Sequence, residues 1–314
     1  MHDVAASLLL AAHLLAMNIA SPGPLVGAWL LLRGRAGHDG AYELGCRIIK
    51  LSLAALIVGS LIGGGLMLLP NPSMQAALAR FPADAFWFAG IELLFSAVCI
   101  AALMGSEWVR DRRYAVVVLA LLSSTNLLYH FPPLMAVLGE LTANPQWAAE
   151  QRIDRAALLR LWTRPEILAV WTHFVLASLA VAPIAAIWSR QRRISSTDGS
   201  PDQRIVQRLA GCSLAATVLQ IPVGLWLLAS TGAAARESML GRDPVASICF
   251  AGGVLAALWL LLTLVTLTFY DDRALVRRAG LLLVTITVLM SATLRTSRDR
   301  DEVTSSPLQV PAPS

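Results

Sequence analysis

The stretch VASICFAGGVLAALWLLLTLVTLTFY, residues 245–270, contains no charged side chain over its whole length. An α-helix rises about 1.5 Å per residue, so a run of this length can cross the ~30 Å hydrocarbon core of a bilayer. An uninterrupted apolar run of this kind is typical of a transmembrane helix. It therefore predicts that the chain folds in a membrane.

Seven further segments have the same apolar character and are separated by polar stretches. They span about 5–32, 46–69, 85–105, 115–139, 166–188, 207–230 and 277–295. Charged residues make up 14% of the chain and hydrophobic residues 56%, whereas soluble domains carry about 25% charged residues. The sequence thus predicts an all-α integral membrane protein, with about eight transmembrane helices in a bundle over residues 1–295. A soluble enzyme, a disordered protein and a secreted disulfide scaffold are excluded.

The ends of the chain and one internal segment do not fit a spanning helix. Residues 144–164 mix apolar side chains with arginines, which suits either an amphipathic helix on the outer membrane surface or a solvated linker. Residues 296–314 are charged and then rich in Pro and Ser, which predicts a disordered tail. The N-terminus lacks a basic region before its apolar run, so we expect a retained first helix rather than a cleaved signal peptide.

The distribution of basic residues predicts an orientation. The loops after the first, third, fifth and seventh segments hold 15 of the 25 basic residues, and such loops are usually cytoplasmic. We therefore expect a multi-pass membrane protein with both termini outside. The net charge of +5 follows from these loops, and no basic patch is interleaved with aromatic residues, so the expected partner is the lipid bilayer and not a nucleic acid.

Ionisable side chains inside the predicted spans are the candidates for chemistry, because burying them in lipid is costly. They are His13, His130, His173 and Glu92. At the rise of a helix, all four lie about 10–13 Å below the predicted outer end of their segments. A single such residue indicates a hydrogen bond between helices, whereas four in one layer favour a site, with Glu92 as a proton relay.

Buried imidazoles without a thiolate cluster suit b-type haem, whose iron takes axial His nitrogen or His plus Met sulfur. His13, His173 and His130 are the nitrogen candidates. The sulfur candidates, which could equally fill gaps between helices, are Met17, Met135 and Met290. A copper or zinc site and a proton relay through Glu92 remain alternatives. The four cysteines form no C-x-x-C pair and are interpreted as small buried hydrophobes.

Three of the segments together resemble the first part of subunit I of the cytochrome bd quinol oxidases, over about residues 5–230. The resemblance is carried by the order of the segments and by four short strings, which are Leu8–His13, Phe86–Phe95, Met104–Trp108 and Trp171–Ser178.

The resemblance implies roles for three residues. His13 would match the opening-helix histidine that ligates a high-spin haem, and His173 the histidine that ligates the low-spin b haem. Glu92 would match a carboxylate in the proton path near the haems. The chain departs from the family in three places: only about 231–244 stand where the family has its long quinol loop, segment 245–270 has no Met, and segment 277–295 has no Glu.

The function expected from these features is a bd-oxidase-like membrane cytochrome that binds haem b and transfers electrons in a bacterial respiratory chain. It would be a subunit of a membrane oxidoreductase, with a second membrane subunit or an outer-face electron carrier as partner. Two alternatives stay open. One is a cofactor-free transporter, in which the break at Ser21-Pro22-Gly23-Pro24 and Glu92 form the substrate path. The other is a non-catalytic membrane subunit.

Overall fold

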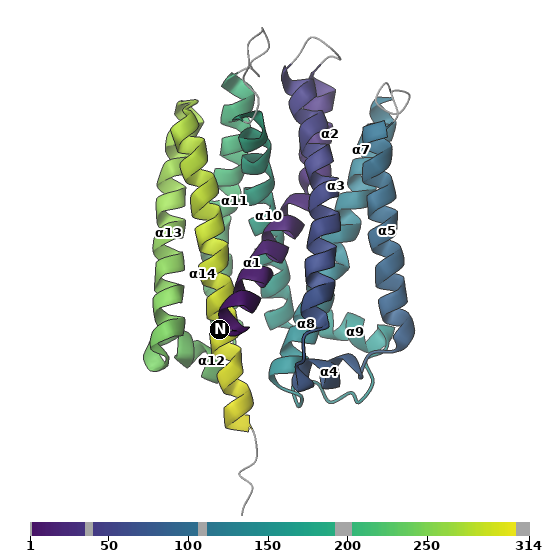
Figure 1. Ribbon diagram of the computed structural model, residues 1–314, viewed down its shortest axis with the longest axis vertical. Coiled ribbons are helices and arrows are strands. Elements are labelled where there is room, and N and C mark those ends of the chain that lie inside the picture. The colour runs from purple at the N-terminus through teal and green to yellow at the C-terminus, as the bar shows by residue number, and fades with distance from the viewer. Residues whose placement is uncertain (1, 35–39, 106–111, 192–202, 306–314) are drawn as a thin grey trace, which may run out of the picture.

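The computed structural model describes residues 2–34, 40–105, 112–191 and 203–305, and all regular structure in these ranges is helical. Long helices run side by side along the molecule (Figure 1). Eight of them are long and apolar enough to cross a membrane, which confirms the predicted fold class. These spans are Val4–Arg33, Gly40–Met67, Ala83–Gly105, Arg113–Ala143, Pro165–Arg190, Gln203–Ser230, Pro244–Phe269 and Arg273–Ser297.

Shorter helical segments stand between several of these spans. In chain order, the described elements are α1 (His2–Ala20), α2 (Gly23–Arg33), α3 (Gly40–Met67), α4 (Pro72–Leu78), α5 (Ala83–Gly105), α7 (Arg113–Tyr129), α8 (Phe131–Ala143), α9 (Arg155–Trp162), α10 (Pro165–Gln191), α11 (Gln203–Ser230), α12 (Ala233–Glu237), η1 (Ser238–Arg242), α13 (Pro244–Phe269) and α14 (Arg273–Ser305).

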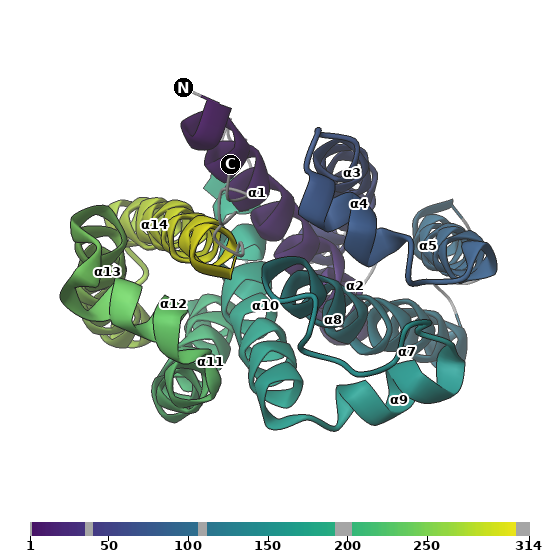
Figure 2. The ribbon, with the colours of Figure 1, turned by 90° about the horizontal axis from the view of Figure 1, so that it is seen from below.

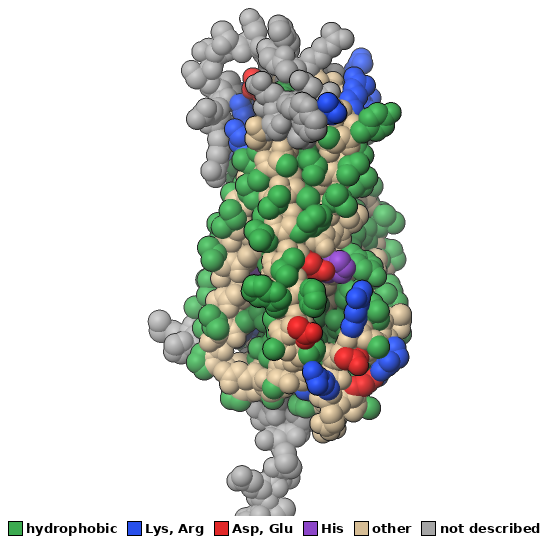
Figure 3. Space-filling view, turned by 90° about the vertical axis from the view of Figure 1, so that its right-hand side faces the viewer, with side chains coloured by type: hydrophobic (Ala, Val, Ile, Leu, Met, Phe, Trp, Pro, Cys, Tyr) green, Lys and Arg blue, Asp and Glu red, His purple; other side chains and the backbone are tan. Residues whose placement is uncertain are grey.

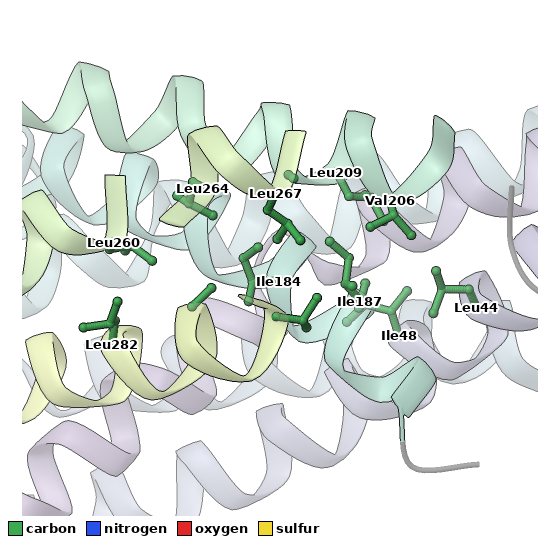
Figure 4. Packing of buried hydrophobic residues seen from close by; sticks show 14 of the residues in the cluster. Leu44, Ile48, Ile184, Ile187, Val206, Leu209, Leu260, Leu264, Leu267 and Leu282 are labelled. Atoms are coloured by element: carbon green, nitrogen blue, oxygen red, sulfur yellow. The ribbon is translucent and has the colours of Figure 1, made fainter. Parts of the chain in front are cut away.

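Seen from below, the spanning helices form two groups (Figure 2). The first contains α1–α2, α3, α5 and α7–α8, and the second contains α10, α11, α13 and α14. A shared apolar core joins the groups, because Leu44 and Ile48 of α3 belong to the same cluster as Ile184 and Ile187 of α10 (Figure 4). The α1 helix also packs on α3, α10 and α14.

Proline breaks two of the spans. Between α1 and α2 the chain passes through Pro22, and between α7 and α8 it bends at His130, before Pro132. Proline has no N–H, so Pro132 cannot donate to the carbonyl of Leu128 as a helix residue normally does. The indole N–H of Trp171, on α10, donates to this carbonyl at 2.6 Å instead. The bend is therefore fixed by a contact with the second group of helices.

The second group is held together by a close approach at one glycine. A Cβ built at Gly280 of α14 would overlap the six-membered ring of Trp188 of α10. Because close packing between membrane helices depends on small residues at the contact, the α10–α14 contact requires that position 280 has no side chain.

We predict that Gly280→Ala destabilises the protein. The added methyl group would push the Trp188 ring out of its place, and overpacking of this kind costs about 1–3 kcal/mol. The measurement is the thermal unfolding midpoint of the detergent-purified protein, which should fall. Gly211→Ala on α11 is the matched control, because a Cβ there meets nothing within 4 Å. An equal fall in both variants would contradict the packing explanation.

A small cap covers one end of the first group, at the end of the bundle where α1 begins (Figure 1). It contains α4, α9 and the loop between α8 and α9. The guanidinium of Arg80 donates to the carbonyls of Pro145 at 2.7 Å and Ala148 at 2.9 Å, and also to that of Glu150. Arg80 accepts in return, through its carbonyl, from the N–H of Ile153 at 2.8 Å. Arg80 thus holds the loop through four hydrogen bonds.

The cap includes the segment 144–164, for which the sequence leaves open an amphipathic helix or a solvated linker. Only Arg155–Trp162 is helical, and it buries Ala157, Leu161 and Trp162 against the cap. In the loop before α9, a hydrogen bond from its own backbone N–H, together with the Arg160 guanidinium at 3.3 Å, holds the pKa of Glu150 below its ordinary value. The placement of this segment on the outer membrane surface stays a prediction.

We predict that Arg80→Gln opens the cap loop and leaves the spans folded. Hydrogen bonds from a charged donor contribute about 1.5–3 kcal/mol each, so losing them should accelerate cleavage of the loop by proteinase K by about ten-fold or more. Limited proteolysis in detergent with mass spectrometry of the fragments measures this. Arg152→Gln, an exposed arginine of the same loop, should cleave at the wild-type rate, and faster cleavage in both variants would contradict the assignment.

The two ends of the described chain lie at one end of the bundle, and the last helix reaches into the predicted tail. Helix α14 continues to Ser305, beyond the start of the predicted tail at Thr296, and residues 306–314 of that tail lie outside the described residues. The first turn of α1 and the last turns of α14 lie at the same end of the bundle (Figure 1), as an even number of spans requires. The membrane side on which they lie stays a prediction.

Candidate functional site

The four ionisable residues that the sequence places in one layer all lie nearest to the same end of the bundle. Counted from that end, Glu92 lies nine residues into α5 and His173 eight residues into α10, or about 12–14 Å along each helix. His13 lies eleven residues into the tilted α1, and His130 lies thirteen residues from the end of α8. They share one half of the bundle but face different neighbours.

Glu92 and His130 are the two that the structure brings together. The Oε1 atom of Glu92 lies 3.1 Å from Nδ1 of His130, so a carboxylate–imidazole pair within the spans joins α5 to the bend between α7 and α8. The same Nδ1 lies 2.9 Å from the side-chain oxygen of Asn126. An amide oxygen can only accept a hydrogen bond, so Nδ1 of His130 carries the proton, which Asn126 and Glu92 share.

Asn126 holds this pair in place. Its side-chain amide donates to the backbone carbonyl of Glu92 at 2.8 Å and to the hydroxyl of Ser96 at 2.9 Å. Both N–H groups of the Asn126 amide are therefore bonded to α5, and its oxygen is bonded to His130. We call the set of Glu92, Ser96, Asn126 and His130 the α5–α7 polar cluster.

The cluster opens sideways, toward the position of lipid. The side chain of Glu92 is 33% exposed and that of His130 is 37% exposed. Figure 3 shows an acidic and a histidine side chain touching on the face formed by α5 and α7, within a broad apolar surface. A proton donor and acceptor at this position can therefore be reached from the bilayer.

Aromatic rings connect the cluster to the rest of the molecule. Tyr129 lies between the rings of His130, Trp162 and Trp171, with centroid distances of 5.0, 5.3 and 5.5 Å. Edge contacts of this kind add to packing energy beyond the buried area. The bend at His130 is thus in contact with the cap through Trp162 and with α10 through Trp171.

His13 faces α3. Its Nδ1 donates to the carbonyl of Gly59 at 2.8 Å, and its ring lies so close to Gly63 that a Cβ there would approach Cε1 to 2.6 Å. A carbonyl only accepts, so Nδ1 holds the hydrogen and, in the neutral ring, Nε2 keeps a lone pair. Histidines that bind metals are oriented in the same way, by donating the other ring N–H to a carbonyl or carboxylate.

His173 lies on α10, the helix that packs against α1. Its Nδ1 is buried and has no hydrogen-bond partner among the residues that the structure describes. Buried polar atoms are normally paired, and an orphan needs an explanation. A group absent from the protein chain, such as a bound cofactor or water, would satisfy it.

Met290 is used in packing. Its side chain lies against Gly253 of α13, where a Cβ would approach the Met290 Cε to 2.6 Å. The thioether therefore occupies the seam between α13 and α14. Over the described ranges, no three or more His, Cys, Asp or Glu side chains gather as a metal-binding group.

Sequence reasoning missed Asn126 and Ser96, and with them the connection between Glu92 and His130. A signal was present, because Ser123-Ser124-Thr125-Asn126 is a polar run in the middle of an apolar span. Asn126 and His130 are also four residues apart, which places them on one helix face. The bend at Pro132 and Pro133, which interrupts the predicted span 115–139, was readable in the same way.

Comparison of the chain with protein-family models, with curated proteins and with solved structures gives no match. The geometry of the site is therefore the main basis for assigning a function.

We predict that Asn126→Ala weakens the contact between α5 and α7. Hydrogen bonds between membrane helices contribute about 0.6–2 kcal/mol, so the unfolding midpoint in detergent should fall. Thr125→Ala is the control, because the Thr125 hydroxyl bonds only to carbonyls of its own helix. If Thr125→Ala lowers the midpoint as much, the hydrogen bonds of Asn126 do not join the helices.

Proposed function

We propose that the protein is a b-type membrane cytochrome that transfers electrons in the respiratory chain of a bacterial inner membrane. The observation that carries the proposal is a pair of imidazoles on two helices that pack together, His13 on α1 and His173 on α10. Each has a ring nitrogen available for a group that the protein chain does not supply. The resemblance of the segments around both residues to subunit I of the bd oxidases agrees with this proposal.

The residues fit haem. The hydrogen bond to Gly59 orients the His13 ring and leaves Nε2 as the nitrogen that would ligate iron. Gly63 presents no side chain to the ring. The buried, unpaired Nδ1 of His173 is the orphan that iron ligation or a cofactor contact would explain. Haem, when bound, supplies an iron that gains and loses one electron reversibly.

The surrounding residues would set the environment of such an iron. Met17, Leu127, Ile100 and the partly buried Phe174 belong to one apolar cluster that connects α1, α5, α7 and α10. Excluding water from this region strengthens the interaction between a change in iron charge and nearby protons. His13 and His173 would thus serve as ligands, and the cluster would serve as the low-dielectric wall.

The Glu92–His130 pair would hold the accompanying proton. With Nδ1 of His130 against Oε1 of Glu92, an added proton would be held between the imidazole and the carboxylate, and it would raise the charge of the pair by one. Asn126 is a positioning residue, because it holds both partners. The sideways exposure of the pair gives it a route to a proton donor or acceptor in the bilayer.

We predict that the detergent-purified protein shows a Soret band, and an α-band in the dithionite-reduced minus air-oxidised spectrum, with at least one haem per chain. His173→Ala should remove the low-spin signal, because it removes a nitrogen that would ligate the iron, and His13→Ala should lower the haem content. The measurements are the visible spectrum and quantification of extracted haem.

His130→Ala is the matched control. It removes a histidine at a similar depth whose side chain is 37% exposed on the sideways-facing α5–α7 polar cluster, so haem content should stay at the wild-type value. A colourless protein from cells grown with ample haem would overturn the proposal. An unchanged spectrum in His173→Ala would overturn the ligand assignment.

One observation favours a second function, that of a cofactor-free transporter coupled to protons. The α5–α7 polar cluster lies beside a broken span, and broken helices often line substrate paths. In that case the protein is colourless, and Glu92→Gln should abolish proton-coupled uptake into proteoliposomes. The presence or absence of haem separates the two functions before any transport assay.

A further inference from the structure

A groove of about 330 Å³ lies between α13 and α14, away from the α5–α7 polar cluster. It is formed by Trp259 of α13 and by one stripe of α14, with Arg277, Arg278, Leu281, Leu282 and Thr285. These positions recur at intervals of three, four and seven residues, so they lie on one face of the helix. The stripe is basic at its start and apolar one turn further on.

The basic end of the groove carries uncompensated positive charge. Arg277 and Arg278 are both exposed, and no described carboxylate forms an ion pair with either. The two acidic residues closest in sequence are engaged elsewhere, because Asp271 pairs with Arg190 at 2.8 Å and Asp272 accepts from the N–H of Ala274. The groove therefore attracts an anion.

The apolar end of the groove faces the position of the acyl chains. Trp259 is 56% exposed and Leu281 is 62% exposed, and both belong to membrane-spanning segments. The guanidinium of Arg278 lies 5.9 Å from the Trp259 ring, so the cationic and apolar parts of the groove adjoin. The arginines lie four and five residues after the start of span Arg273–Ser297, about 6–8 Å along the helix and therefore close to the headgroup level.

We propose that this groove binds an anionic phospholipid. Arg277 and Arg278 would hold the phosphate through charge-assisted hydrogen bonds, and Trp259, Leu281 and Leu282 would contact an acyl chain. Basic pockets beside transmembrane helices recognise anionic headgroups in this manner. The shared ligand chemistry is a phosphate group, and the adjoining apolar wall assigns it to a lipid rather than to free phosphate.

The test compares Arg277→Gln/Arg278→Gln with the wild type, each purified in detergent micelles. Binding is followed by the rise in unfolding midpoint and by native mass spectrometry during titration with phosphatidylglycerol. Parallel titrations use phosphatidylcholine with the same acyl chains and inorganic phosphate. Each basic residue near an anionic headgroup adds to the binding free energy. The loss of two such residues predicts about 30-fold weaker phosphatidylglycerol binding in the double variant.

Arg113→Gln/Arg208→Gln is the matched control. It removes the same charge from two exposed arginines that lie outside the groove, at the same end of the bundle, and it should bind phosphatidylglycerol like the wild type. Circular dichroism and gel filtration confirm that both double variants are folded.

The proposal requires that phosphatidylglycerol binds more tightly than phosphatidylcholine and that only the groove variant loses this preference. Equal binding of the two lipids, or an equal loss in the control variant, overturns it. Stabilisation by inorganic phosphate that matches the effect of phosphatidylglycerol would make the site an anion site and overturn the lipid assignment. Because the readout is lipid binding, failure of the haem proposal leaves this test unaffected.

Discussion

The structure depends on one constraint, which is that every backbone polar group inside a bilayer must find a partner within the protein. A straight helix meets this constraint by itself, but a helix that contains proline does not. At the bend between α7 and α8, the carbonyl of Leu128 loses its donor because Pro132 has no N–H, and Trp171 of α10 supplies a replacement at 2.6 Å. The bend can therefore exist only where α10 packs against it.

The same constraint explains how the candidate residues are held. His13 bonds to a carbonyl of α3, Asn126 bonds to a carbonyl of α5, and Trp171 bonds to a carbonyl of α7. In each case a side chain from one helix uses the backbone of another, and so the polar groups fix the rotation of the helices about their axes. His173 is the exception, because its buried Nδ1 has no partner among the described residues. His173 lies on α10, the helix that contacts both groups of helices.

Sequence reasoning could predict the eight spans and the depth of the ionisable residues, because both depend on position along a helix. The run 245–270 decides its own structure by length and lack of charge alone. Rotation about the helix axis depends instead on which helix lies beside which, and one sequence does not contain this. The half of the bundle that holds the four groups was therefore readable, whereas the pairing of Glu92 with His130 and the packing of Met290 on Gly253 were not. The Arg80 cap was also hidden, because it depends on carbonyls from a loop 65–70 residues away along the chain.

The separation of the two proposed sites follows from the two groups of helices. The α5–α7 polar cluster lies in the first group, and the arginine groove lies in the second, on α13 and α14. A proton taken up by Glu92 and His130 would raise the charge of that pair by one, so its uptake would respond to a charge that appears nearby in a medium of low dielectric constant. The guanidinium groups at the groove keep a fixed charge at any physiological pH. A mobile proton suits the proposed response to electron transfer, whereas a fixed charge suits the proposed contact with lipid. The helices that carry the two kinds of residue lie on opposite sides of α10.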